Sequence, residues 1–401
     1  MKPVRGRDIR ESNEKLILRI IRDGKGISQS EVVNLTGLRP PTVLRFFSHL
    51  EDKGFIRHVR REPDKKLNKE KRGRKPVFYE PVPEAAYSLG MEFWAYSASA
   101  VIVDFAGEVV FSRSWNLDPA DKSDVIIFLR TIFRESVEAS NIPEEKLLGL
   151  CVAAPGQIDV ETGELIQYSR MGIADINLGK ALNEEFHLPV TVQNNSAAVA
   201  WDEYQRGVGK DVRSLFSVMI RAGVGGAFLD DGDIFVTKTH TTLEIGHITV
   251  EYNGRKCDCG SRGCLETYLS EGAIINDLLP AVRLKSITDI DSLILQGDKR
   301  VTTILDEKAG ILAQAIRNLI SLFGPEMFLI VTRSPELGKY LANRVRSKVK
   351  SQASARWQGQ TLIESAVYDP EKAGRGAANL VFKKFFSNLH YRNSIEIYDN
   401  S

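Results

Sequence analysis

Three of the chain's four cysteines lie within eight residues of one another, at Cys257, Cys259 and Cys264. His247 stands ten residues before the first of them, and two glycines lie between the second cysteine and the third. Three thiolates and one imidazole complete a tetrahedral ligand set for Zn2+, and glycine lets a short loop turn around an ion. A disulfide or a group of buried thiols is the alternative, but a Cys-x-Cys pair bridges poorly and nothing else suggests secretion. The spacing predicts a structural zinc site, because the protein supplies all four ligands.

The composition is typical of a soluble protein. Of the 401 residues, 43% are hydrophobic and 26% are charged, and no apolar run is long enough to cross a bilayer. The first residues lack the hydrophobic segment of an export signal. The fourth cysteine, Cys151, lies in an apolar run and is expected to be a buried strand residue. We therefore expect a cytoplasmic protein that does not associate with a membrane and is long enough for two or three domains.

The net charge of +2 hides an asymmetry between the two parts of the chain. Residues 1–80 contain 21 Lys and Arg against 11 Asp and Glu, whereas the remainder contains 33 against 41. A strongly basic segment is suited to a polyanionic partner such as nucleic acid. The amino-terminal part is therefore expected to bind such a partner, and the rest is not.

Three short helices are expected in this basic part. Apolar residues recur at helical spacing over residues 16–21, after Ser12 or Asn13 as the cap. A capping box at residues 28–31 predicts a second helix, and Pro40 suits the first turn of a third. The buried stripe of the third helix is predicted to consist of apolar residues at helical spacing, namely Val43, Leu44, Phe47 and Leu50. This pattern predicts a helix-turn-helix.

The outer face of the third helix and the segment after it carry the candidate DNA contacts. Strands expected at residues 55–59 and 76–79 would enclose a wing at residues 60–75, which holds nine Lys or Arg against three acids. We thus predict a winged helix-turn-helix domain over residues 1–80. Its predicted DNA-binding residues lie at the start of the third helix and at the end of the wing: Arg39, Pro41, Thr42, Arg45, Arg72, Arg74 and Lys75, with Ser48 or His49 as further candidates. A helical dimerisation module with a solvated charge run is the alternative.

From about residue 87 the pattern changes to alternating strands and helices, which predicts an α/β body. Together with the cysteine loop, several stretches resemble the ROK family of repressors and sugar kinases, in particular its branch of winged-helix regulators that respond to xylose, glucose or N-acetylglucosamine. The matching stretches are residues 154–159, 221–226, 244–247, 257–266 and 318–326. The resemblance implies an actin-like, ribonuclease H-like body of two lobes with a sugar between them. The smaller lobe would comprise residues 86–193 plus roughly 386–401, and the larger lobe residues 194–385 with the zinc loop.

The resemblance also assigns a sugar site. Asn194, Glu244, His247 and Glu266 would contact hydroxyl groups, and Asn195 could still form a hydrogen bond to the sugar. Amide, carboxylate and imidazole groups suit a ligand that presents both donors and acceptors. His247 would give one ring nitrogen to zinc and the other to the ligand. The alternative for the two glutamates is a solvated surface position.

The positions that phosphoryl transfer would need in this family are altered. Active members have an aspartate that accepts the proton of the sugar hydroxyl, and Asn195 stands in its place. An amide cannot accept that proton at neutral pH. The first phosphate loop is replaced by residues 92–96, in which Trp94 stands where glycine would allow close approach, and the second reads Arg-Ala-Gly-Val-Gly-Gly over residues 221–226. Residues 332–334 replace the glycines beside the adenosine.

These features favour a sugar-responsive DNA-binding transcriptional regulator of carbohydrate genes, more often a repressor in this family, without enzymatic activity. Its partners would be double-stranded operator DNA and a small sugar effector, and it would act as a homodimer or homotetramer. Two alternatives remain: an active ATP-dependent sugar kinase with a DNA-binding head, and a binding protein that takes no small-molecule signal. The sequence does not identify the sugar or the operator.

Overall fold

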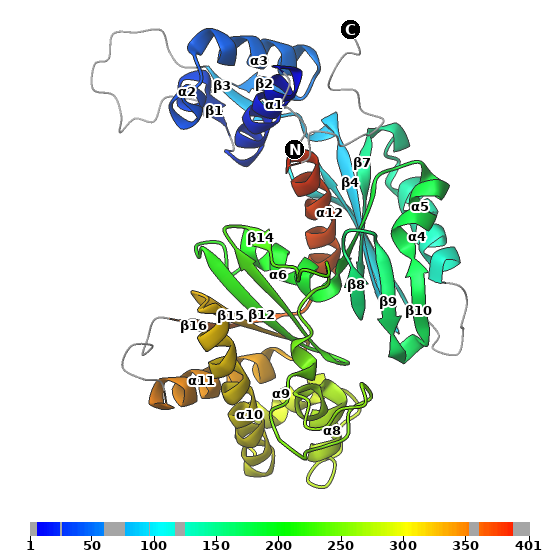
Figure 1. The fold of residues 1–401 in the computed structure, drawn as a ribbon, viewed down its shortest axis with the longest axis vertical. Helices are drawn as coiled ribbons and strands as arrows, with labels where there is room; N and C mark the ends of the chain where they lie inside the picture. Colours follow the sequence, from blue (N-terminus) through cyan, green and yellow to red (C-terminus); the bar gives the residue numbers. More distant parts are fainter. Residues whose placement is uncertain are drawn as a thin grey trace.

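A computed structural model of the chain describes residues 6–24, 26–59, 77–95, 97–116, 125–352 and 361–387. It consists of a small amino-terminal head and a body of two lobes, each built on a five-stranded sheet (Figure 1). This arrangement confirms the predicted fold class. None of the described helices combines the length and the apolarity that a membrane span requires.

The head is a winged helix-turn-helix. It contains three helices and three short strands: α1 (Gly6–Asp23), β1 (Ile27–Ser28), α2 (Gln29–Thr36), α3 (Pro40–Asp52), β2 (Ile56–Val59) and β3 (Phe78–Pro81). The predicted capping box is present, since the Ser28 side chain accepts from the backbone of Glu31 and the Glu31 carboxylate accepts from Ser28. Helix α3 begins at Pro40 as expected.

Two details of the head differ from the prediction. Helix α1 begins at Gly6 rather than after Ser12 or Asn13, because the helix extends toward the amino terminus, past the start of the apolar stripe. In α3, Leu44 is 53% exposed, and Phe46 takes the buried place in the stripe. The sequence pattern allowed either residue to face inward, and the packing of α3 against α1 and α2 selects the aromatic ring.

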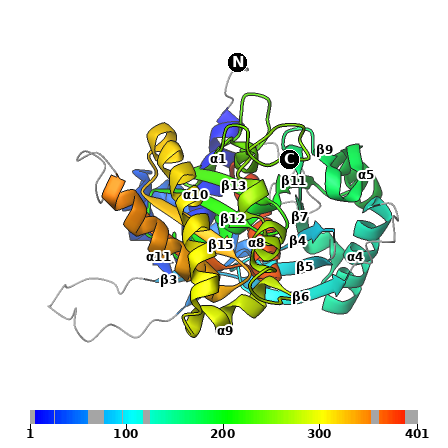
Figure 2. The same ribbon diagram turned by 90° about the horizontal axis from the view of Figure 1, so that it is seen from below.

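The first lobe is a mixed sheet with strand order β11-β7-β4-β5-β6. Its strands are β4 (Tyr87–Trp94), β5 (Ser97–Asp104), β6 (Val109–Asn116), β7 (Leu147–Ala154) and β11 (Val190–Asn194). One face is covered by two helices, α4 (Val125–Ser140) and α5 (Leu178–Phe186). Figure 2 shows these helices on the outer side of the lobe. A small antiparallel sheet extends from the lobe through β8 (Gln157–Asp159), β9 (Glu164–Tyr168) and β10 (Ile173–Asn177), and the short 3-10 turns are η1 (Pro83–Ala85), η2 (Glu144–Lys146) and η3 (Ser169–Met171).

The second lobe has strand order β14-β13-β12-β15-β16. Its strands are β12 (Ser214–Ile220), β13 (Val224–Asp230), β14 (Asp233–Ile234), β15 (Met327–Thr332) and β16 (Leu362–Val367). The outer helices are α7 (Glu266–Leu269), α8 (Glu271–Leu278), α9 (Ile290–Leu295), α10 (Lys299–Phe323) and α11 (Pro335–Gln352), with 3-10 turns η4 (Ile245–His247) and η5 (Ile287–Asp289). Helices α10 and α11 pack on one face of this sheet through a core separate from that of the first lobe.

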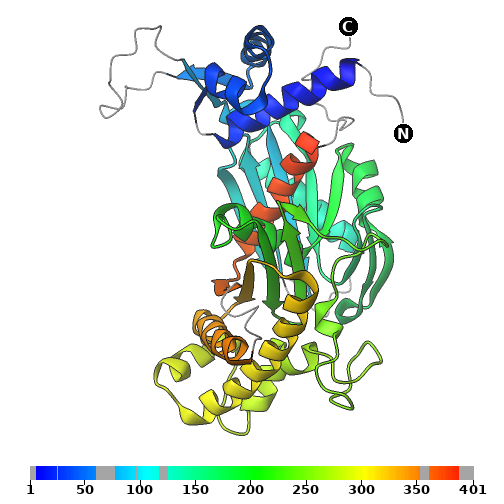
Figure 3. The ribbon, with the colours of Figure 1, turned by 60° about the vertical axis from the view of Figure 1, so that its left-hand side comes forward.

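Two helices lie between the lobes and join them. Helix α6 (Asn195–Arg206) covers the inner face of the second sheet, and α12 (Pro370–Ser387) covers the inner face of the first. They approach closely, because a Cβ on Gly376 would collide with the carbonyl of Ala198, and Arg375 binds Asp202 through two hydrogen bonds of 2.7 Å each. Figure 3 shows α12 running from the space between the lobes to the head.

Candidate functional site

The predicted metal ligands come together in space. His247 belongs to η4, and the cysteines belong to the loop before α7. Their four ligand atoms all lie within 4.8 Å of one another. His247 Nδ1 is 3.6 Å from Cys257 Sγ, and the sulfurs of Cys259 and Cys264 are 3.7 Å apart. A tetrahedral zinc ion with bonds of about 2.3 Å holds two sulfurs about 3.8 Å apart, whereas a disulfide bond is only about 2 Å long. The donor set and its spacing fit a metal.

The backbone of the loop explains how so short a segment encloses a site. Gly260 and Gly263 have φ angles of +88° and +69°, which side-chain-bearing residues rarely adopt. The amide of Cys257 donates to the carbonyl of Ser261 at 3.0 Å, which closes the turn. The amide of Leu265 donates to the carbonyl of Ile248 at 3.0 Å, so the loop is held against the strand-like segment that follows His247.

The thiols of this site need a cation to ionise together. Burial and the neighbouring thiols raise the pKa of Cys264 to about 12, and burial also raises the pKa of Cys257. The pKa of Cys259 is lowered, first by the amide of Ser261. Three thiolates this close would repel one another without a positive charge between them. One imidazole and three sulfurs are a set that zinc prefers.

The residues that the resemblance assigned to a sugar also come together. We call Asn194, Asn195, Glu244, His247 and Glu266 the polar cluster. They lie around the turn between β12 and β13. Glu266 Oε2 accepts from the amide of Val224 at 3.1 Å, and Ser196, in the first turn of α6, packs against Gly225. The turn η4, which Glu244 precedes, packs against β13.

Within the polar cluster, Asn194 positions the start of α6. Its Oδ1 accepts from the amide of Ser196 at 2.8 Å, and its Nδ2 donates to the carbonyl of Gly156 at 2.9 Å. Asn195 is only 8% exposed, yet its side chain forms no hydrogen bond to any other described residue. A buried amide in this condition is suited to a ligand.

The two glutamates of the polar cluster lie close enough to influence each other. Glu244 is accessible to solvent, but the surrounding protein atoms raise its pKa; Glu266 raises it further, and His247 opposes the shift. Since Nδ1 of His247 faces Cys257, Nε2 is the ring nitrogen left for a ligand. The cluster therefore offers carboxylate, amide and imidazole groups at one place.

The segments that replace the nucleotide loops meet where the two lobes touch. Arg221 Nη1 lies 3.1 Å from Glu92 Oε1, and the hydroxyl of Tyr368 donates to Glu92 Oε2 at 2.9 Å. The Arg221 guanidinium also stacks on the rings of Trp94 and Tyr368, at 4.3 and 3.6 Å from their centroids. Burial raises the pKa of Glu92, and Arg221 and Tyr368 oppose that shift. Next to this group, Arg333 Nε donates to Glu271 at 2.8 Å. These side chains therefore bind one another in the contact between the two lobes.

The sequence alone gave no signal for one further contact between the lobes. Arg170, in η3 of the first lobe, donates to the carbonyl of Ala222 in the second at 2.6 Å. Ala222 belongs to the same β12–β13 turn that the polar cluster surrounds. Arg170 thus lies beside the polar cluster, although no motif singled it out. Tyr96, the last residue of the altered segment 92–96, lies outside the described residues.

The predicted DNA contacts of the head fall into two groups. Arg39, Pro41 and Arg45 are exposed at the amino-terminal part of α3, and Thr42 is half-buried there. His49, a further candidate, faces inward instead, with Nε2 3.4 Å from the buried carboxylate of Glu14. The three predicted wing residues, Arg72, Arg74 and Lys75, lie outside the described residues.

The head packs firmly on the body through one arginine that the sequence did not indicate. Arg22 Nε donates to the carbonyl of Phe105 at 2.9 Å, and Nη2 donates to Asn379 of α12 at 3.1 Å. Its guanidinium lies over the ring of Phe382, 4.3 Å from the centroid, and its side chain is 13% exposed. Burial lowers the pKa of Arg22 to about 10. Phe55 of the head extends this contact with a ring 5.5 Å from that of Phe105.

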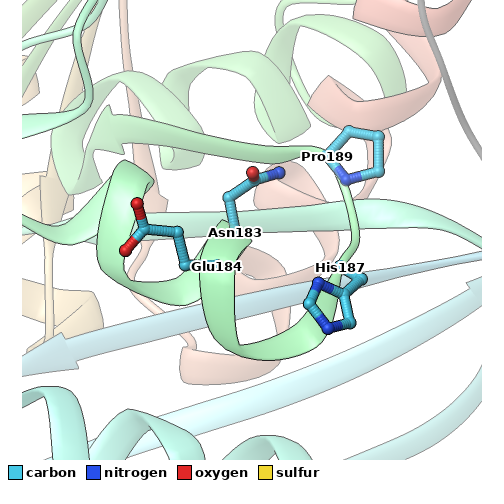
Figure 4. Close-up of a pocket in the computed structure, with 4 residues that line it drawn as sticks. All are labelled: Asn183, Glu184, His187 and Pro189. Atoms are coloured by element: carbon cyan, nitrogen blue, oxygen red, sulfur yellow. The ribbon is translucent and has the colours of Figure 1, made fainter.

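A hollow on the outer surface of the first lobe lies away from all these groups. Its lining residues, at the carboxyl end of α5, are Asn183, Glu184, His187 and Pro189 (Figure 4). The Asn183 amide is already engaged, since it donates to the carbonyl of Leu188 at 2.6 Å. The hollow contains no residue of the polar cluster, so we do not regard it as the functional site.

Comparison with known families gives two matches that fit this architecture. A model described as the ROK family matches residues 97–384, and a model described as winged helix-turn-helix DNA-binding matches residues 10–57. Together they cover most of the head and nearly all of the body.

Named relatives and solved structures agree with these two family matches. The chain is 25% identical over 363 residues to a xylose repressor of Caldicellulosiruptor bescii, covering 86% of this chain and 89% of that protein. It is 21% identical over 398 residues to the transcriptional dual regulator NagC of Escherichia coli, covering 97% and 96%. Among crystal structures, a ROK family transcriptional regulator described as a homolog of the E. coli MLC protein superposes with a TM-score of 0.82 at 23% identity, covering 97% and 100%. A ROK family glucokinase from Streptomyces griseus gives 0.64 at 21% identity, over 74% and 99%.

Proposed function

The chain belongs to the ROK family, and from this premise we propose that it is a sugar-responsive, DNA-binding transcriptional regulator, a repressor, that acts in the cytoplasm. Its named relatives that regulate transcription span most of the chain, head included. The polar cluster would bind the sugar effector, and the head would bind operator DNA. The observation that carries this proposal is a continuous packed connection between these two places.

That connection runs through two helices. Asn195 is the first residue of α6, and α6 is tied to α12 by the paired hydrogen bonds between Asp202 and Arg375. The carboxyl-terminal half of α12 then carries Asn379 and Phe382, which hold Arg22 of the head. A sugar that prefers one position of α6 would thereby shift the orientation of the head and its affinity for DNA. A sugar that bound both positions equally would change nothing.

We propose that the body has no kinase activity. Asn195 offers no group that accepts the proton of a sugar hydroxyl at neutral pH. The group of buried Glu92, Arg221 and Tyr368 with half-buried Trp94 supports the same view, because its members bind one another where the resemblance places the phosphates of a nucleotide. An assay of ADP release with hexoses, pentoses and amino sugars tests this part. Turnover above background would overturn it and favour the alternative, an active sugar kinase with a DNA-binding head.

We further propose that zinc occupies the site of His247, Cys257, Cys259 and Cys264 as a structural ion. The geometry supports this, since the four ligand atoms lie within 4.8 Å of one another and supply the four ligands of a structural zinc site. When bound, the ion would hold the η4 turn to the cysteine loop and would orient His247 within the polar cluster. Glu244 lies close enough to both His247 and Glu266 for their charges to shift its pKa.

For the assembly, we propose a homodimer or a homotetramer on a roughly palindromic operator. Two α3 helices in successive major grooves would bring Arg39, Pro41, Thr42 and Arg45 to the DNA, and the wing residues Arg72, Arg74 and Lys75 to its backbone. The head would comprise residues 1–80. Because α12 packs on the first sheet, we place the return of the chain to the smaller lobe near Pro370, earlier than the boundary near residue 386 that the sequence suggested.

A gel-shift titration tests the central proposal. Full-length protein is mixed with DNA from upstream of its own gene, with and without a panel of sugars. We expect specific binding that one sugar changes by at least about tenfold. Absence of specific binding to any upstream fragment would contradict the DNA-binding function. Specific binding that no sugar alters would instead favour a regulator without a small-molecule signal.

A further inference from the structure

The outer face of α3 carries an exposed leucine that does not contribute to the core. Leu44 is 53% exposed. The buried side of the same helix packs into the core of the head through Val43, Phe46, Phe47 and Leu50. An exposed leucine is common on protein surfaces, so its exposure alone indicates no function. This leucine, however, lies on the helix that would enter the major groove.

Leu44 belongs to a row of exposed residues, which we call the outer stripe. Its members are Pro41, Leu44, Arg45 and Ser48. They are spaced three and four positions apart, so they lie on one side of the helix. The outer stripe contains one cation, one hydroxyl group and two apolar side chains. The two acids of α3 lie at its carboxyl end, away from the start of the stripe.

The first four residues of α3 offer a phosphate no free amide. Pro40 and Pro41 have no N–H group, and the next two amides both donate to the carbonyl of Arg39, at 2.9 and 3.2 Å. A helix end that binds phosphate does so through free amides. This end of α3 instead presents two exposed proline rings one turn before Leu44. The start of the helix is therefore an apolar surface with Arg45 beside it.

The chemistry of the bases indicates what such a surface can recognise. In the major groove each base pair shows its own pattern of donors and acceptors, and thymine adds an apolar group, the C5-methyl. The side chain of Leu44 has no donor or acceptor, so it distinguishes bases through apolar contact. Arg45, the next residue, carries a guanidinium that suits guanine or a phosphate. The two side chains would therefore contact different groups of the DNA.

Resting on the DNA-binding function proposed above, we infer that Leu44 is a specificity-determining residue that recognises one thymine in each operator half-site through the C5-methyl group. Pro41, one turn earlier, extends the apolar surface that meets this methyl group. The contact removes the methyl group from water, which raises the affinity about fourfold for each half-site. The operator should therefore hold a thymine at the position that faces Leu44.

The test is a gel-shift titration of the full-length protein on its operator, with each thymine of a half-site replaced in turn by deoxyuridine. This replacement removes the methyl group and keeps every donor and acceptor of the base. We expect the Kd of the wild-type protein to rise about fourfold at one thymine of each half-site, and about fifteenfold when both are replaced. A Kd that no replacement changes would overturn this inference and leave the DNA-binding proposal standing. If no upstream fragment is bound specifically, both fail.

Two variants assign the effect to a side chain. Leu44→Ala should bind the thymine operator more weakly than wild type does, and deoxyuridine at the same position should no longer change its Kd. Leu35→Ala shortens another exposed leucine of the head, on α2, and should respond to deoxyuridine as wild type does.

The same variants separate contact from DNA shape. A response that arises from altered shape of the DNA would persist in Leu44→Ala, and this result would contradict the inference. Loss of the response in Leu35→Ala alone would contradict it as well, because the methyl contact would then belong to α2. Titration at lower salt keeps a weakened variant measurable, since phosphate contacts then strengthen its binding to both forms of the operator.

Discussion

Arg221, the residue that follows β12, forms an ion pair with Glu92, near the end of β4. This pair joins the two lobes, with 3.1 Å between Nη1 of Arg221 and Oε1 of Glu92. Both side chains are almost completely buried. Each lies in a segment that stands where the resemblance places a phosphate loop of the family's kinases, with an altered sequence. The pair therefore holds these two segments, one from each lobe, together.

Removing one partner of this pair should destabilise the protein. We expect Arg221→Met to lower the free energy of unfolding by about 3 kcal/mol, because Glu92 is left buried without its partner. Urea denaturation followed by circular dichroism measures the change. Arg344→Met serves as a control, since Arg344 and Asp306 form a pair of 2.8 Å that is half-exposed and should contribute less than about 1 kcal/mol. Equal effects of the two substitutions would contradict a structural role for the buried pair.

The zinc site should depend on its cysteines and not on the fourth thiol. Protein purified without chelator should contain about one zinc ion per chain, and Cys264→Ser should retain much less and melt at a lower temperature. Cys151→Ala is the matched control, because Cys151 is buried in β7 away from the loop. Elemental analysis by mass spectrometry counts the metal. Wild-type protein free of zinc, or loss of zinc from the Cys151 variant, would speak against the assignment.

Arg22 should couple the head to the body. Arg22→Ala removes the hydrogen bonds to Phe105 and Asn379, so we expect sugar affinity to remain within about twofold while the sugar loses its effect on operator binding. Calorimetry and gel-shift titration give the two readings. Arg19→Ala, on the exposed face of the same helix, should behave like wild type. A normal sugar response in the Arg22 variant would show that the signal travels by another route.

The exposed start of α3 should contact DNA. We expect Arg45→Ala to weaken operator binding about tenfold, as loss of one contact to a base or phosphate does. The salt dependence of Kd indicates which contact was lost, since a phosphate contact reduces its slope by about one. Lys210→Ala removes an exposed positive charge from the body and should not change the affinity. Equal losses in both variants would mean that charge alone, without a docked helix, explains the binding.

Stability in acid should depend on Asp298, which caps α10. Its Oδ1 accepts a hydrogen bond from the backbone amide of Arg300 at 2.9 Å. The pKa of Asp298 is lowered from 3.8 to about 2, mainly by its hydrogen bond with the Arg300 side chain. Because the folded pKa is lowered, the carboxylate contributes fully above about pH 3.8 and its contribution fades as the pH falls toward 2. Asp298→Asn keeps a hydrogen-bond acceptor but has no group that titrates. The difference in urea midpoint between wild type and this variant should therefore shrink as the pH falls from 5 to 3. A difference that stays constant with pH would refute this reading.

The local features of the chain could be predicted from its sequence because their causes are local. The capping box of Ser28 and Glu31 forms within four residues, and the apolar run around Cys151 is a strand wherever it is placed. The four metal ligands lie within eighteen residues, so their spacing nearly determines that they meet. Leu44 and the start of α1 were predicted wrongly, because the choice between two allowed packings depends on distant neighbours.

What only the tertiary structure decided are the contacts between segments far apart in the chain. Glu92 and Arg221 are 129 residues apart, and Arg22 and Asn379 are 357 apart, yet each pair is in hydrogen-bond contact. No motif marks such pairs, because the sequence does not distinguish an arginine that will be buried from one that stays in solvent. Only the fold determines which arginine is desolvated and which carboxylate or carbonyl it meets. The sequence thus determined which chemical groups the protein contains. The packing of α6 and α12 between the lobes decided which of these groups are free to bind a ligand and which bind one another.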